Sequence, residues 1–180
     1  MKRSKEFQAE STGLMRRRRI AILFILITDI GVVAWGAMAT LLPDYLLGPG
    51  ARPILQAEYE SYTNGSWSAL KTTSPAIADF ITILFRMYGM FNVVFGLMAV
   101  TIAVNSFRRG ERWAWWALLV GNTIALGSAI TFDRVVNAIG IFEMSEYLGL
   151  VLVYVALILT ARFSPRARIH ASALRMRQTD

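Results

Sequence analysis

The sequence predicts an all-α fold: an antiparallel bundle of four transmembrane helices with the N and C termini cytoplasmic. Two observations predict it. Charged residues make up only 17% of the 180 residues and hydrophobic residues 55%, whereas soluble domains carry about 25% charged residues. The chain also holds four apolar runs, each long enough to cross a hydrocarbon core of about 30 Å, which takes roughly 20 helical residues. We divide it into a basic arm (1–19), a membrane domain (20–161) and a basic tail (162–180).

The first apolar run covers about 20–42 and directly follows four arginines, Arg16–Arg19. A signal peptide has a shorter apolar core of about 7–15 residues and a small-residue cleavage site. We therefore expect a first helix that is retained and spans the membrane. Pro43 ends the run.

An outer loop over 43–75 follows and is the longest polar stretch between the runs. Within it, Pro53 to Tyr62 is expected to form a short helix, because proline suits the first turn. Asn64-Gly65 is typical of a turn. We expect Trp67 at the membrane interface, where amphipathic rings collect.

The remaining spans are expected at about 76–104, 113–132 and 141–161. A short basic loop over 105–112 joins the first two of them, and Asp133–Gly140 is a tight connection before the last. Short connections favour antiparallel neighbours in a helical bundle. Such helices meet through small residues, because lipid removes most of the hydrophobic drive for association.

Basic residues orient the bundle. Fifteen of the 19 lysines and arginines lie in three segments that four crossings place on one side: seven in the arm, three in the 105–112 loop and five in the tail. The positive-inside rule makes that side cytoplasmic. The net charge of +7 is then a topology signal and an attraction to anionic lipid head groups, not a sign of nucleic-acid binding. We expect the bacterial plasma membrane, with lipids as partners; a homo-oligomer or larger membrane complex stays open.

Several chemistries are excluded by composition. The chain has no cysteine, so disulfides, thiolate metal sites and iron–sulfur clusters are ruled out. Its one histidine, His170, cannot supply both ligands of a haem held by two histidines. The sequence contains no HExxH, P-loop or GxGxxG motif and no evident nucleophile–base pair. We expect a non-enzymatic protein with no cofactor and no metal site.

Polar residues inside the spans mark the candidate site. Asp29 lies about 13 Å from the inner end of the first span, and Arg86 lies about 15 Å from the outer end of the second. A charge at such depth normally faces the bundle interior and has a partner, so we expect an Asp29–Arg86 ion pair. Asn122, about 13 Å along the third span, would complete a polar layer. The alternative is a purely structural pair that fixes helix register.

A second polar group is expected toward the outer face. Helical spacing places four residues on one stripe of the second span and four on one stripe of the last span: Asp79, Thr82, Arg86 and Met90, and Glu143, Glu146, Leu150 and Tyr154. Facing each other, these stripes would line a polar pocket that opens outward, with Tyr147 nearby. The alternatives are glutamates solvated at a helix start, where negative charge is favourable, and an Asp133–Arg134 cap at the interface.

Three short motifs stand out in the second half of the chain: Phe85–Gly89 (FRMYG), Phe95–Leu97 (FGL) and Gly127–Arg134 (GSAITFDR). The first two are similar to the R-x-Y-G … G-L pattern in the second helix of the DoxX-like family of small four-helix membrane proteins, and the last resembles that family's third helix. The resemblance covers about 76–160. Arg134 departs from it, since the family's arginine stands closer to its glycine. The resemblance implies a four-helix bundle and draws attention to Arg86 and a glutamate of the last span, but it implies no reaction.

Three functions stay open. The first is a non-enzymatic module that binds a lipophilic small molecule or serves as an accessory subunit of a membrane complex, which small size and the lack of catalytic motifs favour. It predicts an enclosed, mostly apolar pocket that touches Arg86. The second is a small proton- or cation-coupled carrier, whose path would be lined by Asp29, Asp79, Arg86, Glu143 and Glu146. The third is a subunit of a quinone-linked oxidoreductase, the kind of complex with which DoxX is associated, whose cofactors would come from partners.

Overall fold

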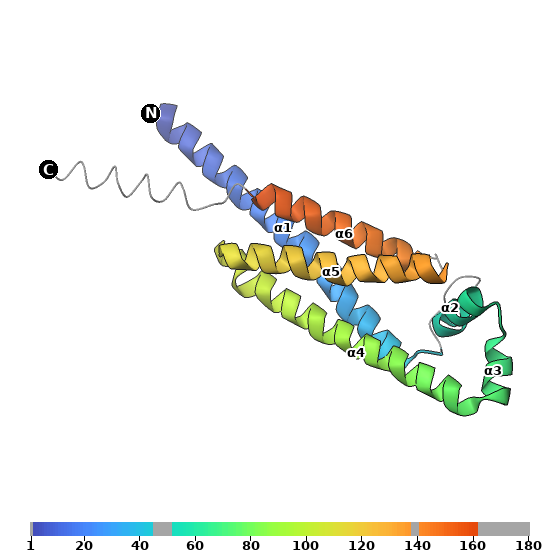
Figure 1. Cartoon of the computed structure of the whole chain (residues 1–180). Helices are drawn as coiled ribbons and strands as arrows, with labels where there is room; N and C mark the ends of the chain where they lie inside the picture. The colour runs from blue at the N-terminus through green and yellow to red at the C-terminus, as the bar shows by residue number, and fades with distance from the viewer. Residues whose placement is uncertain (1, 45–51, 138–140, 162–180) are drawn as a thin grey trace.

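The computed structural model describes residues 2–44, 52–137 and 141–161, with side chains for all of these except 2–12, 14 and 141–143. The regular structure in these ranges is helical throughout (Figure 1), which confirms the all-α class. The elements are α1 (Lys2–Leu41), α2 (Ile54–Thr63), α3 (Trp67–Thr73), α4 (Pro75–Asn105), the short 3-10 helix η2 (Phe107–Arg109), α5 (Arg112–Val136) and α6 (Ile141–Thr160).

Three segments of the described chain have the length and apolar composition of membrane-crossing helices: Met15–Leu41, Pro75–Arg109 and Arg112–Val136. A shorter apolar helix covers Met144–Thr160. Apolar helices of this length match the hydrocarbon thickness of a bilayer. They identify the chain as an integral membrane protein.

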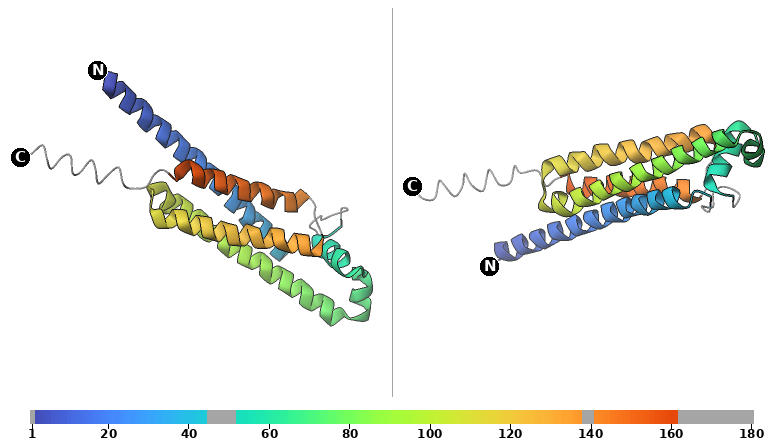
Figure 2. Two further views of the ribbon diagram at one scale, coloured as in Figure 1. Left: turned by 45° about the horizontal axis from the view of Figure 1, so that its top comes forward. Right: turned by 90° about the horizontal axis from the view of Figure 1, so that it is seen from below.

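The long helices run antiparallel, and each lies beside its neighbours for much of its length (Figures 1 and 2). α1 packs most extensively on α4 and next on α6, while α5 packs on α6 and more loosely on α4. α1 begins and α6 ends at the same end of the bundle, and α2 and α3 lie at the other. We call these the inner and the outer end.

Glycines set the contact between α1 and α4. A Cβ built on Gly36 would lie 2.5 Å from the Gly89 carbonyl oxygen, and one on Gly96 would lie 2.9 Å from the Asp29 carbonyl oxygen. Only residues without side chains let two backbones approach so closely, as in many membrane helix pairs. The contact also fixes the register, with Gly36 opposite Gly89 and Asp29 opposite Gly96.

An apolar core fills the inner half of the bundle. It combines small and large side chains from α1, α4, η2, α5 and α6, which interdigitate without charged members. Its buried residues are Ala21, Ile25, Ala99, Ala103, Phe107, Ala114, Leu118, Val153, Ala156 and Leu157. This core ends where the first buried polar side chains begin.

At the outer end, α3 packs on α4 and α2 packs on α5, while Ile54 of α2 also contacts Ala39 of α1. The predicted short helix and the turn after it are both confirmed, and Asn64 caps α2 in the left-handed conformation with φ 55°. Trp67 is only 4% exposed and packs with Leu55 and Ala78. Its side chain thus packs on protein, and its position at the membrane interface stays a prediction. The indole anchors α3 to α4, in edge contact with Tyr59 at 5.2 Å between ring centroids.

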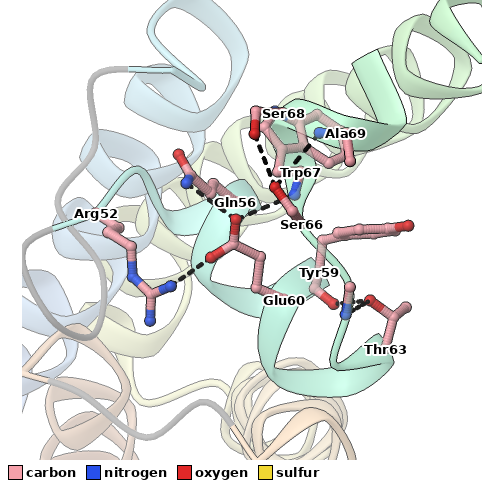
Figure 3. A network of polar contacts seen from close by, with 10 residues as sticks. Arg52, Gln56, Tyr59, Glu60, Thr63, Ser66, Trp67, Ser68 and Ala69 are labelled. Atoms are coloured by element: carbon pink, nitrogen blue, oxygen red, sulfur yellow. Dashed lines mark hydrogen bonds and ion pairs between the residues drawn. The ribbon is translucent and has the colours of Figure 1, made fainter. Parts of the chain in front are cut away.

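Glu60 joins α2 to α3 (Figure 3). Its Oε1 accepts hydrogen bonds from the Trp67 backbone N–H at 3.0 Å and from Gln56 Nε2 at 3.1 Å, and its Oε2 pairs with Arg52. The Trp67 N–H, followed by Gln56, lowers the pKa of Glu60 below its usual range. Hydrogen bonds favour the charged form of a carboxyl in this way.

Candidate functional site

Asp29 is the charged residue most deeply enclosed among those the structure describes, with 0% of its surface exposed. It shares the inward face of α1 with Ala21, Ile25 and Thr28, at the spacing of three and four residues that an α-helix places on one side. Neither of its carboxyl oxygens accepts a hydrogen bond from a residue that the structure describes. A buried polar group without a partner is costly, so this residue needs a functional or structural explanation.

Asn122 on α5 lies beside it. Its surface is also 0% exposed, and its Nδ2 donates to the Leu118 carbonyl oxygen at 3.2 Å, while its Oδ1 has no hydrogen-bond partner. The side-chain amide of Asn122 interacts with the Asp29 carboxyl group, although the two groups do not meet the geometric criteria of a hydrogen bond. The predicted polar layer thus brings Asp29 and Asn122 together. We call this pair the Asp29–Asn122 centre.

All four long helices meet at this centre. α4 contributes the bare backbone of Gly96 next to Asp29, and α6 contributes Gly149, where a Cβ would lie 3.0 Å from Thr28 Cγ2. Thr28 Oγ1 donates to the Phe24 carbonyl oxygen at 3.1 Å. Among the described residues, no charged side chain acts on Asp29.

The predicted Asp29–Arg86 ion pair is wrong. Arg86 lies on the exposed face of α4, and its carbonyl oxygen accepts a hydrogen bond from Thr40 Oγ1 at 3.2 Å. Arg86 is therefore level with Thr40, 11 residues beyond Asp29 on α1, or about 16 Å along the helix. The depth count failed because α4 begins well beyond the outer end of α1, so its first residue does not mark the membrane edge.

The two predicted stripes do not face each other. Asp79, Arg86 and Met90 are all exposed, so this side of α4 points away from the bundle. The buried face of α4 is made of small residues instead: Ala78, Gly89, Gly96, Ala99 and Ala103. Close backbone contact with α1 requires that face inward, and it turns the charged stripe outward. Among the side chains that the structure describes, the predicted pocket between these stripes is not formed.

A different acidic group gathers near the outer end. Tyr88 on α4 lies within electrostatic range of Glu146, Asp133 and Glu58, which come from α6, α5 and α2. Glu146 thus belongs to a polar cluster as expected, but with partners other than the predicted ones. Sequence reasoning missed Glu58, because only the folding of α2 over the bundle brings it there.

Asp133 is buried within α5 and is not the predicted interfacial cap. α5 continues to Val136, and Asn137 caps it with φ 53°. Asp133 follows Asn122 by 11 residues, three helical turns, on the same buried face. That periodicity was visible in the sequence. Leu126 and Ala129 separate the two polar levels by about 16 Å.

The remaining candidates lie on α6. Tyr147 accepts a hydrogen bond from Arg134 Nε at 3.0 Å, and the guanidinium stands over its ring at 5.9 Å. Tyr154 pairs with Thr123 at 3.1 Å between their oxygens. The side chain of Glu143 lies outside the described residues.

Comparison with protein-family models, curated proteins and solved structures gives no match. The apolar helices and the polar interior define the class to which the chain belongs, a helical integral membrane protein. The DoxX-like resemblance stays a prediction.

Proposed function

We propose that the chain crosses a membrane four times, with its N- and C-terminal segments in the cytoplasm. The simplest candidate is the bacterial plasma membrane. α6 has 20 residues, which extend about 30 Å. It packs along α1 and α5 within the same bundle, so it shares their depth. Four crossings also agree with α1 beginning and α6 ending at the same, basic end (Figure 1).

We further propose that the Asp29–Asn122 centre binds a proton, and that the bundle is a small proton-coupled carrier. The observation that carries this proposal is a fully buried carboxyl group beside which the described part of the chain places no cationic side chain. An ionisable residue inside a membrane is costly and commonly belongs to a proton or ion path.

A proton fits the centre better than a metal ion does. Asp29 Oδ1, Asp29 Oδ2 and Asn122 Oδ1 are three acceptors to which no described residue donates a hydrogen bond. Calcium needs six to eight oxygen ligands and magnesium a full octahedron. One proton, by contrast, turns the acidic group into a donor, which could then bond to the amide oxygen.

The other functions have less support. The lipophilic-binder hypothesis expected an enclosed pocket at Arg86, and this side chain lies on the exposed face of α4. An accessory subunit has no need of an interior carboxyl. No feature of the described residues favours a quinone-linked subunit over a lipophilic binder or an accessory subunit. In a carrier, the acidic group near the outer end (Glu58, Asp133 and Glu146) would collect protons. The apolar layer formed by Leu126 and Ala129 would separate the Asp29–Asn122 centre from that end.

Proteoliposomes test this function. An imposed membrane potential should drive proton uptake, read with an internal pH dye, in the presence of a panel of amino acids, sugars and organic cations. Asp29→Asn should abolish the uptake, whereas Asp79→Asn, the same change on an exposed surface, should retain it. Uptake by the Asp29 variant at the wild-type rate would rule out the proposed role.

A further inference from the structure

A hollow of about 450 Å³ lies at the inner end of the bundle. It is lined by three arginines and two apolar side chains: Arg18, Arg19, Arg108, Met15 and Ile22. Four of these come from α1 and one from η2. The volume falls within the range of small-molecule sites.

The guanidinium of Arg18 is held in place by the neighbouring turn. Its Nη2 donates to the Phe107 carbonyl oxygen at 3.0 Å, and Phe107 is buried in the inner apolar core. The turn ends at Gly110, whose φ of +81° suits glycine. A Cβ at that position would lie 3.2 Å from Arg18 Nη2. The fold thus positions this guanidinium group beside the turn.

The hollow is strongly basic, since three of its five lining residues are arginines. Arg18 and Arg108 are close enough to repel each other. None of the three lining arginines forms an ion pair with an acidic side chain that the structure describes. The adjacent residue Arg109 pairs with Glu111. An anion would remove this repulsion, since guanidinium groups bind phosphate with two parallel hydrogen bonds.

The apolar part of the lining sits on the membrane side. Ile22 packs against the inner apolar core, one turn deeper than Arg18. A ligand that fits both parts has a negatively charged head and an apolar tail. In an inserted bundle this level coincides with the head groups of the cytoplasmic leaflet, which carries anionic lipid.

We propose that this hollow binds one anionic phospholipid, with the phosphate between Arg18, Arg19 and Arg108 and the start of an acyl chain against Ile22. The proposal rests on the four-crossing topology and is independent of proton binding at Asp29. The lipid would tie the inner end of α1 to the 105–112 loop.

Native mass spectrometry of the full chain in detergent can count the retained lipids during titration with dioleoyl phosphatidylglycerol. One lipid should bind in preference to dioleoyl phosphatidylcholine. Neighbouring basic residues each contribute about a fivefold gain in affinity for anionic lipid. Arg19→Gln with Arg108→Gln should therefore weaken binding about 25-fold. The matched control is Arg16→Gln with Arg17→Gln, which removes the same charge from exposed positions outside the hollow.

The control double variant should keep the tight binding of a single lipid. An equal loss in both double variants would mean diffuse attraction and would overturn the site. Equal retention of phosphatidylcholine would overturn it as well. Displacement of the lipid by millimolar glycerol phosphate would identify a site for free phosphate compounds and would also contradict the proposal. Circular dichroism checks that each variant is folded.

Discussion

Replacing Gly36 with alanine should force α1 and α4 apart. The new Cβ would lie 2.5 Å from the Gly89 carbonyl oxygen and 2.8 Å from Val93 N. Ordinary contact begins near 3.4 Å, and both neighbours are backbone atoms that cannot rotate away. The helices must therefore separate by about 1 Å, and gaps of this size forfeit a quarter to a half of each dispersion contact. Overpacking of this kind costs about 1–3 kcal/mol.

The assay is SDS-induced unfolding of the purified protein in mild detergent, followed by circular dichroism. Gly31→Ala is the matched control, because it lies on the same helix and a Cβ there meets nothing within 4 Å. Gly36→Ala should lower the free energy of unfolding by about 1–3 kcal/mol, and Gly31→Ala should not lower it. Equal stability of the two variants would refute the glycine-mediated packing of α1 on α4.

Two further predictions concern the ends of the bundle. Glu60 has a lowered pKa in the folded protein, so it stabilises the contact between α2 and α3 at pH values above its unfolded-state pKa. This contribution is lost as the pH falls through the folded-state pKa. Hydrogen exchange at the Trp67 amide, corrected for its intrinsic rate, should show the loss, and Glu60→Gln should remove the pH dependence. Trp115→Phe should cost about 0.5–1.5 kcal/mol in SDS unfolding, because the indole donates to the Leu157 carbonyl oxygen at 3.0 Å. Trp113→Phe removes an indole hydrogen bond to Glu111 at an exposed position, where water can replace it, and should leave stability unchanged. Equal effects of the two indole substitutions would contradict this assignment.

The helices were predictable because lipid and water impose strong patterns on a sequence. Apolar length marked the long helices, and Pro53 and Asn64 marked the ends of α2. The inward face of Asp29 was also predictable, since charge avoids lipid. Its neighbour Asn122 followed from depth alone, because α1 and α5 both enter the membrane close to their basic inner ends.

The partner of Arg86 could not be predicted in this way. The depth of Arg86 depends on how far α4 extends past the outer end of α1. The contact of Gly36 with Gly89 sets that offset. Contacts of single glycines are invisible in a hydropathy pattern. The same holds for Glu58 and Trp67, whose positions follow from the folding of the outer loop onto the bundle.

The most direct test of proton binding at the Asp29–Asn122 centre is the infrared spectrum of the protein in lipid bilayers at neutral pH. A protonated carboxyl group gives a C=O stretching band that a carboxylate lacks. We expect this band in the wild type and in Asp79→Asn, its disappearance in Asp29→Asn, and a shift in Asn122→Leu, which removes the acceptor. A band that persists in Asp29→Asn, or no such band in the wild type, would contradict the proposal.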